Sequence, residues 1–583
     1  MDRSPMRARV AYLAFSIACA SPLASADEAG LARAFSWIPE DAVSFVAVPS
    51  LKALSNDIAQ LVEATGQGGL LSMGRPIDVL KAQLGVGANL DENGPAVAYF
   101  PSVPLADIAA TPRPVVVVPV TDGEAFLKAN LTPAPDRGER AYTTSDGMEV
   151  HARILEGCVV LAPTSDTLPA EAPARGIGER FRGRLKPRET AWLGRADLVA
   201  WGSRDALHSA VERARREPLP VIPEAVPEGV PGAVGAQQEA ARAKALEIAD
   251  MLADGLVVVD VDPLGLFVAA LGVAEPATAL AAVMAGGEGP GARFDRLPDN
   301  PFYLALSADI DGLGGSARFG ELMDLAGLPR TMLPDWVFAE GSDIAGLQLG
   351  AFPSKLGVAM GGALNDSALF LASRDPARTL QRIRSTVESL AGESAGIRRE
   401  PSWTEGKKLK SGELADAFEI KETVFDAKQR PTLDYERLAK QFTFGARGFN
   451  GLARRTDRGV VLTFSQRPDV FDRAVRAAGG VDVLASDETV RSLEEWLPER
   501  RDVELMIGVG PLVNLAAQIA SSFVSEEQVR EMLPSIERDA TPVAVAAELG
   551  EGRAALVLVL PAEVLKAFTQ AGARFGGAAG GTP

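Results

Sequence analysis

The chain has 583 residues, of which 47% are hydrophobic and 23% are charged, and its formal net charge is −18. A chain of this length is too long for a single hydrophobic core, so we expect several domains. Neutralising phosphates requires a basic surface, so the acidic balance argues against a nucleic-acid partner. The densest positive run, residues 180–188 (RFRGRLKPR), is predicted to be a solvated connector.

Residues 1–26 have the three parts of a signal peptide. Three arginines within the first nine residues precede an apolar run at residues 10–20, and Ala24-Ser25-Ala26 forms an A-x-A cleavage site. We therefore expect export to the periplasm or the extracellular space, with cleavage between Ala26 and Asp27. The apolar run is about half as long as a bilayer needs, and no later segment reaches roughly 18 uninterrupted apolar residues, so we expect no transmembrane segment after processing. Lipidation of Cys19 is a minor alternative, because the preceding residues imitate a lipoprotein signal poorly.

Cleavage at this site leaves Cys158 as the one cysteine of the mature chain. A secreted chain with one cysteine has no internal disulfide, so its stability must come from packing. Cys158 lies in the apolar segment GCVVLAP, which predicts a buried strand and an unreactive thiol.

One pattern recurs along the chain: an apolar run typical of a buried strand, a polar or proline corner, and then helical spacing of apolar residues. Residues 45–64 (FVAVPSLKALSNDIAQLVEA) show it first, with Ser50 or Ser55 as the helix cap. The pattern returns at residues 191–214, where the strand is expected in WLGRADL, and at residues 302–326 and 504–523. These repeats indicate a repeated strand–helix architecture, and they do not point to any particular catalytic or binding chemistry.

Further elements complete the first half. We expect strands at residues 96–100 and 114–120, a helix from Asp122, and a hairpin at residues 149–163 that turns near Glu156-Gly157. Next come a proline-rich exposed loop at residues 218–235, a helix at 236–254, a hairpin turning at 262–265, and a short helix from Pro276.

The second half is predicted to follow the same plan. Strands are expected in IAGLQLGAF, KLGVAMGGAL and ALFLAS, followed by a helix opened by Asp375-Pro376. An insertion at residues 398–440 is expected to be a long hairpin or loop. A hairpin at 451–465, helices at 467–480 and 525–533, a hairpin at 543–561 and a helix from residue 562 follow.

The predicted fold class is α+β, with two pseudo-repeated halves. Each half has an antiparallel-sheet subdomain with ferredoxin-like βαββαβ order and a smaller β-α-α-β-β-α subdomain. The expected subdomains are residues 27–186, 187–290, 291–485 and 486–577, and residues 578–583 form a disordered tail.

The chain contains one match to a hydrolase motif, G-x-S-x-G at residues 392–396. In a hydrolase this serine follows a strand, and a histidine base follows later in the chain. Here a predicted helix precedes Ser394, and the two histidines, His151 and His208, both lie upstream. The motif therefore predicts a loop that ends a helix.

Metal and phosphate sites also lack their usual residues. His151 in a hairpin and His208 on a helix face are expected to be structural, and no H-E-x-x-H, C-x-x-C or Walker A motif occurs. The glycine-rich segment 286–291 lacks the flanking strand and helix of a dinucleotide site. The segment 309–312 (DIDG) starts like a calcium loop without its later ligands, so it is expected to cap a helix from Leu313. The sequence thus predicts no catalytic, cofactor-binding or metal-binding residues.

Three segments, PVVVVPVTDGEAFLKAN, DGMEVHARILEGCVVLAPTSDTL and ETAWLGRADL, resemble a known family. They look like the uncharacterised exported bacterial proteins grouped as domain-of-unknown-function family 3352. The resemblance covers residues 33–285 and extends more loosely to the second half. It implies a signal peptide and this strand–corner–helix architecture, and it brings no catalytic residues. The insertion at 398–440 and the proline-rich loop depart from the family outline.

We therefore expect an exported, non-enzymatic interaction or scaffold protein of the cell envelope. A carrier of a lipid or other apolar ligand is the alternative, and a hydrolase that uses two of the 77 acidic residues is the least favoured. A large exposed apolar patch would favour the scaffold, an apolar cavity the carrier, and a cleft with two close acids the enzyme. The sequence leaves the ligand, the partner and the oligomeric state open.

Overall fold

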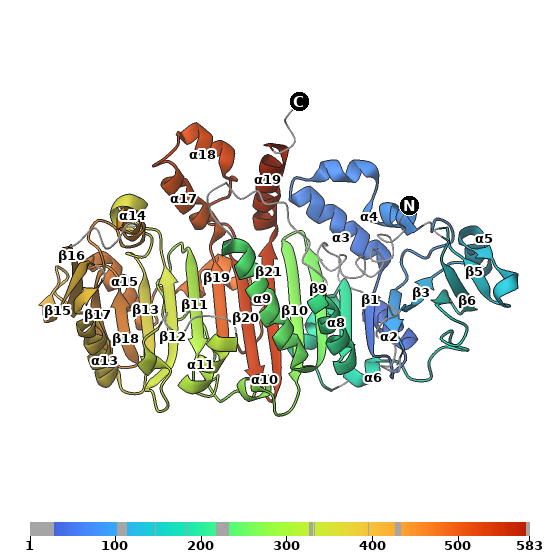
Figure 1. The fold of residues 1–583 in the computed structure, drawn as a ribbon, viewed down its shortest axis with the longest axis horizontal. Coiled ribbons are helices and arrows are strands. Elements are labelled where there is room, and N and C mark those ends of the chain that lie inside the picture. Colours follow the sequence, from blue (N-terminus) through green and yellow to red (C-terminus); the bar gives the residue numbers. More distant parts are fainter. Residues whose placement is uncertain are drawn as a thin grey trace. The chain divides into compact units, whose positions relative to one another are not determined.

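The computed structural model describes residues 28–84, 86–101, 113–145, 147–181, 183–216, 233–325, 330, 333–394, 396–425 and 433–578. The described chain forms two compact units. Unit 1 contains the residues up to Thr278 together with Val559–Thr569, and unit 2 contains Ala279–Leu558 and the residues from Gln570 onward. Each unit is built from helices and an antiparallel sheet (Figure 1).

In the described residues of unit 1 up to Thr278, ten strands have the hydrogen-bonded order β10-β9-β8-β1-β2-β3-β7-β6-β5-β4, and every pair of neighbours is antiparallel. Its elements are α2 (Glu28–Trp37), β1 (Ser44–Val48), α3 (Leu51–Ala64), η2 (Gly68–Met73), α4 (Pro76–Leu84), β2 (Ala96–Phe100), β3 (Val115–Pro119), α5 (Gly123–Asn130), β4 (Thr132–Pro133), η4 (Pro135–Arg137), β5 (Ala141–Thr143), β6 (Glu149–Leu155), β7 (Cys158–Ala162), α6 (Gly178–Phe181), α7 (Pro187–Arg195), β8 (Leu198–Ser203), α8 (Arg204–Arg216), α9 (Ala233–Asp250), β9 (Leu252–Asp262) and β10 (Gly265–Ala274).

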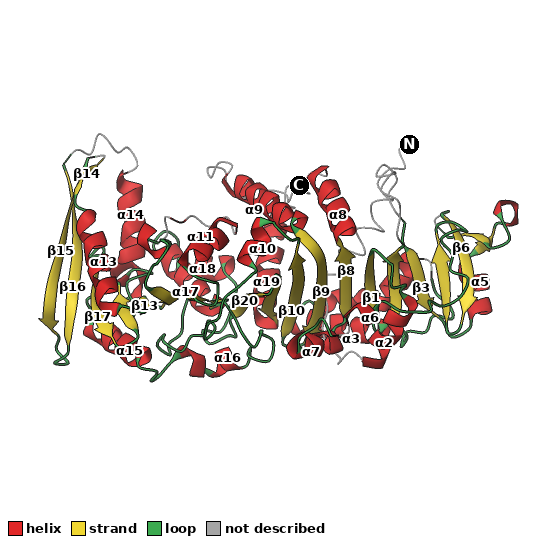
Figure 2. Cartoon of the chain, turned by 90° about the horizontal axis from the view of Figure 1, so that it is seen from below, coloured by secondary structure: helices red, strands yellow, loops and turns green. Residues whose placement is uncertain are grey.

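The first strand–helix segment shows how sequence sets this fold. Residues of β1 alternate between buried and half-buried, and Ser50 caps α3 by accepting a hydrogen bond from the Ala53 N–H (3.2 Å). Leu54 and Leu61 lie on the buried face of α3, and Leu61 packs on strand residues such as Val259. Helices cover both faces of the sheet: α8 and α9 lie on one side of β8–β10 and α7 on the other (Figure 2).

Unit 2 has the strand order β20-β19-β11-β12-β13-β18-β17-β16-β15-β14, again antiparallel throughout. Its elements are α10 (Ala279–Val283), β11 (Leu304–Asp309), α11 (Ser316–Leu325), η6 (Asp335–Val337), β12 (Ile344–Ala351), α12 (Gly357–Gly361), β13 (Ala368–Ser373), α13 (Pro376–Ser389), β14 (Gly392–Ser394), β15 (Ile397–Lys408), β16 (Leu414–Val424), α14 (Leu433–Phe444), β17 (Asn450–Thr456), β18 (Gly459–Thr463), α15 (Pro468–Ala478), η8 (Leu484–Ser486), α16 (Glu488–Arg491), β19 (Val503–Ile507), α17 (Val509–Ala520), α18 (Glu526–Met532) and β20 (Val543–Gly550). Residues of both units contribute to β21 (Arg553–Pro561) and α19 (Ala562–Ala578).

The register of unit 2 places several connections at one end of its strands. Leu304 at the start of β11 pairs with Ala351 at the end of β12 and with Ile507 at the end of β19. Ala368 at the start of β13 pairs with the end of β18. The segments α12, α14, α15 and α17 therefore all adjoin this end, which we call the helix end, and Figure 1 shows α14, α17 and α18 beyond it.

Most predicted elements are present, and the insertion at 398–440 contains the long hairpin β15–β16. Some local predictions are wrong. The expected strand WLGRADL is largely helix α7, with the strand β8 following at Leu198. The expected strand KLGVAMGGAL contains α12, because Gly357 and Gly362 take positive φ values of 71° and 77° and set off a single helical turn.

Two further predictions concern connecting segments. The expected loop at 392–396 contains β14, which pairs with β15. The described residues of the basic run at 180–188 are mostly exposed, as predicted, but the run includes the end of α6 and the start of α7, and the Arg180 guanidinium stacks over the Trp201 ring at 4.6 Å.

Several predictions concern residues that the structure does not describe. The signal peptide, the junction between Ala26 and Asp27, and Cys19 lie outside the described residues, as do nearly all of the loop at 218–235 and the tail beyond Ala578. Across the part of the chain that is described, no helix combines the length and the apolar character needed to cross a bilayer.

Candidate functional site

The residues that the sequence singled out are not brought together. Cys158 is buried on β7, as predicted, and burial raises the pKa of its thiol to about 11. His151 lies on β6 opposite Ala162, and His208 lies on α8, where its Nδ1 is 2.7 Å from Asp250 Oδ1 of α9. The hydrogen bond with His208 lowers the pKa of Asp250. Ser394 is exposed on β14.

The glycine-rich segment and the DIDG segment pack against each other in unit 2. Asp309 accepts hydrogen bonds from the N–H groups of Gly291 (2.6 Å) and Gly312 (2.9 Å). A Cβ at position 289 would lie only 2.2 Å from Asp309 Oδ2, so a residue larger than glycine would clash with this carboxylate. The prediction that this aspartate caps a helix is wrong, because α11 begins at Ser316 and the carboxylate is committed to these loop amides.

Three of the buried carboxyl groups of unit 1 form a cluster that sequence reasoning missed. Asp57 on α3, Asp197 just before β8 and Asp260 on β9 are at most 3% exposed. Burial, followed by the negative charges of Asp57 and Asp260, raises the pKa of Asp197 to about 9. Burial also raises the pKa of Asp260 to about 7, with Arg195 opposing the shift. No spacing motif marks these residues, since they come from three separate elements.

This carboxyl cluster is enclosed by packing. Leu61, Leu198 and Val261 form part of the surrounding apolar core. The Val261 N–H donates to Asp197 Oδ2 (3.2 Å). Acid–base catalysis requires a carboxyl group within reach of a substrate, and side chains buried to this degree offer none. In the described part of the chain, no group of three or more His, Cys, Asp or Glu side chains is arranged to hold a metal ion.

A small polar cleft lies at the helix end of unit 2 and has a volume of about 120 Å³. Its lining combines Asp366, Lys355, Arg473, Arg538 and Asn300 with apolar and proline side chains: Pro298, Pro301, Phe352, Pro353, Ala368 and Val470. Burial raises the pKa of Asp366, while the positive charge of Arg467 opposes the shift.

Exposed apolar side chains occur on helices at this same end. α12 packs against α14 and α17. The Val358 N–H donates to Gln518 Oε1 of α17 (3.0 Å), and the rings of Phe442 and Phe523 lie 6.3 Å apart. These helices and the residues next to them carry six large apolar side chains that are exposed to solvent, which we call the apolar helical surface: Leu356, Met360, Leu364, Leu438, Leu512 and Phe523.

α17 accounts for much of this exposure. Among its twelve residues only Asn514 and Gln518 are polar, yet only Gly510 and Pro511 are fully buried. A surface helix normally shows a polar face to water and an apolar face to the core. The nearly continuous apolar composition of α17 is the one signal for this surface in the sequence, and its exposure is visible only in the structure.

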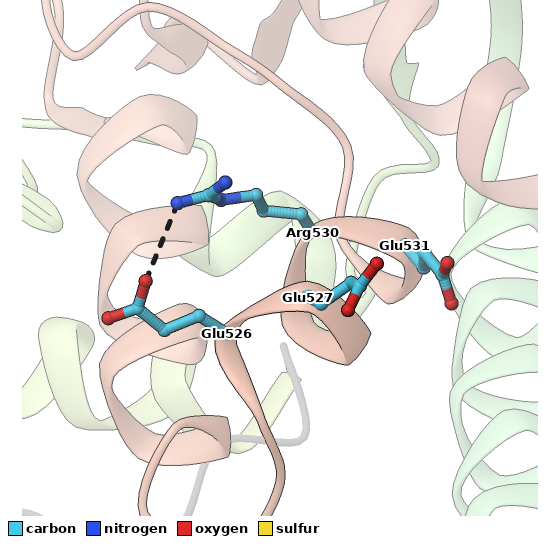
Figure 3. A pocket seen from close by; sticks show the side chains of 4 residues that line it. All are labelled: Glu526, Glu527, Arg530 and Glu531. Carbon is cyan, nitrogen blue, oxygen red and sulfur yellow. Dashed lines mark hydrogen bonds and ion pairs between the residues drawn. The ribbon is translucent and has the colours of Figure 1, made fainter.

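Charged side chains of α18 line an open hollow (Figure 3). Glu526, Glu527, Arg530 and Glu531 all come from this one helix, and the ion pair of Arg530 with Glu526 (3.4 Å) joins two side chains that are each 81% exposed. Such exposed pairs contribute little energy, so the hollow is a solvated helix face.

Comparisons with protein-family models, with curated proteins and with solved structures find no match for this chain. The resemblance to the exported family therefore stays a prediction, and the function must be argued from the chain itself.

Proposed function

We propose that this chain is an exported, non-enzymatic docking protein that binds a polypeptide through the apolar helical surface of unit 2. The observation that carries the proposal is the exposure of Leu356, Met360 and Phe523, whose side chains are 61%, 63% and 64% accessible. Clustered apolar side chains of this size on a monomer mark interaction sites, because covering them removes apolar area from water.

The partner is a polypeptide and not a lipid surface. The chain carries a net charge of −18, and α18 adds three exposed glutamates beside α17. A membrane surface that contains anionic lipids would repel such a surface. Polypeptide segments with apolar side chains suffer no such repulsion, and burying aromatic and Met side chains is typical of protein interfaces.

The other two candidate functions have weaker support. A lipid carrier needs an apolar cavity, and the cleft at the helix end is small and about half of its lining is charged or polar. A carboxylate hydrolase needs two accessible acids, and the close pair Asp57 and Asp197 is buried. Both arguments support a binding role.

Export rests on the predicted signal peptide, and the N-terminus of the mature protein tests it. Mass spectrometry of the purified protein is expected to give a chain that begins at Asp27. A chain that retains residues 1–26, or one lipidated at Cys19, would contradict this part of the proposal.

We also infer that the two units repeat one plan, and the two strand orders given above support this inference. The Asp197 N–H donates to Val259 O (2.9 Å), and its carboxyl group accepts from the Val261 N–H. Asp502 repeats the arrangement before β19: its N–H donates to Ala547 O (2.7 Å), and Oδ2 accepts from the Leu549 N–H (2.6 Å).

Site-specific photo-crosslinking tests the docking role. Benzoylphenylalanine in place of Phe523 is expected to crosslink to a polypeptide in the producing cells. The matched control is the same substitution at Phe425, which is 52% exposed and lies after β16, outside the apolar helical surface. Equal crosslinking at both positions, or crosslinking to lipid at position 523, would overturn the proposal.

A further inference from the structure

The cleft at the helix end of unit 2 gathers positive charge from distant parts of the chain. Lys355 follows β12, Arg473 lies on α15, and Arg538 follows α18. The Arg473 Nη1 donates to Asn300 Oδ1 (2.6 Å), which fixes this side chain at the cleft. Among the described residues, the Lys355 ammonium and the Arg538 guanidinium have no carboxylate partner within ion-pair distance.

Two carboxylates close to the cleft, Asp366 and Asp469, already form ion pairs with Arg467. Asp366 accepts from Arg467 Nη1 at both carboxyl oxygens (3.2 and 2.9 Å) and is 3% exposed. Asp469 on α15 pairs with Arg467 (2.8 Å) and lies 3.9 Å from Arg473. Among the residues that line the cleft, three are cations and one, Asp366, is a carboxylate, so the lining has a positive excess in a chain whose net charge is −18.

The size of the cleft limits what it can hold. A volume of about 120 Å³ is several times the ~10–15 Å³ that one water molecule needs. It is below the roughly 300–1,000 Å³ of sites for drug-sized ligands. A group of a few heavy atoms fits these limits.

The side chains select among such groups by charge and geometry. Guanidinium groups hold carboxylate and phosphate oxygens through paired N–H donors, and a lysine ammonium adds a compact charge. Lys355, Arg473 and Arg538 bring both kinds of donor to the cleft.

We propose that this cleft is a binding site for a small oxyanion, a carboxylate or a phosphate group, held by Lys355, Arg473 and Arg538. The site is independent of the docking role, because none of its three cations belongs to the apolar helical surface. The oxyanion can be free, or it can be a side chain or terminus of a bound chain.

Isothermal titration of the full chain with sodium phosphate and with succinate, at constant ionic strength set by chloride, tests the proposal. Saturable binding to one site is expected. Lys355→Gln and Arg538→Gln are each expected to weaken it about tenfold, which corresponds to ~1.4 kcal/mol. Both residues are exposed, so the variants are expected to fold, and thermal unfolding checks this.

Lys410→Gln is the matched control, since Lys410 is an exposed cation of unit 2 at the turn between β15 and β16. It is expected to leave the affinity unchanged. Saturation by phosphate alone assigns the site to phosphate groups, and saturation by succinate assigns it to carboxylates. Absence of saturable binding, or equal weakening in all three variants, would overturn the proposal.

Discussion

At the scale of single residues, Asp197 and Asp502 make the same kind of backbone hydrogen bonds in different electrostatic surroundings. Asp197 is next to two other buried carboxyl groups, and burial and these charges raise its pKa to about 9. Asp502 also has a raised pKa from burial, but Arg500 Nη2 lies 3.0 Å from its Oδ1 and opposes the shift. Neutralising Asp502 should therefore stabilise the protein less than neutralising Asp197.

The Asp197→Asn variant is predicted to be more stable than the wild type at pH 8. Between about pH 4 and pH 9, Asp197 is protonated in the folded state and ionised in the unfolded state, whose pKa is ~3.9. The unfolded state then binds fewer protons, so the free energy of unfolding falls as pH rises through this window. The asparagine removes this loss and keeps an oxygen for the Val261 N–H, for a gain of about 2 kcal/mol at pH 8.

Urea unfolding at pH 5 and pH 8, with hydrogen exchange on β8 and β19, measures the effect in each unit. Asp502→Asn is the matched comparison, and it is expected to gain less stability than Asp197→Asn, because it also removes the charged partner of Arg500. Equal stability of Asp197→Asn and the wild type at pH 8 would contradict this account of the carboxyl cluster.

At the scale of elements, the sequence predicted most strands and helices because apolar periodicity and caps are local signals. Ser50, Asp122 and Asp375 each cap the helix that the sequence placed after them. The errors came in short segments whose composition suits either element. WLGRADL is largely helix: Pro187 and Glu189 in the preceding first turn are local helix-start signals, and Trp192 packs on Phe267 of β10.

The β15–β16 hairpin gives an element-scale prediction. Trp403 stacks on Phe418 with ring centroids 5.7 Å apart, and its Nε1 donates to Asp416 Oδ2 (3.2 Å). Trp403→Ala is expected to destabilise the hairpin locally by about 1–3 kcal/mol, seen as faster hydrogen exchange in β15 and β16. Ser402→Ala, an exposed neighbour, is the control. Unchanged exchange in Trp403→Ala would show that the stack does not hold the hairpin.

At the scale of the whole molecule, the functional features come from residues far apart in sequence. The cleft draws on residues from Pro298 to Arg538, and the buried carboxyl cluster draws on three elements between Asp57 and Asp260. No spacing rule could have predicted either, because both depend on how strands pair. The apolar helical surface was partly visible in the sequence as an apolar α17, but its exposure depends on what packs against it.

The central claim is that the apolar helical surface binds a polypeptide. Once crosslinking at position 523 identifies the partner, the most direct measurement is its affinity for the wild type, for the double variant Met360→Ser and Phe523→Ser, and for the control Phe425→Ser. Truncating a central aromatic anchor removes more than ~1 kcal/mol of binding energy, so the double variant is predicted to bind at least about tenfold more weakly and the control to bind like the wild type. Equal affinity of the double variant and the wild type would contradict the claim.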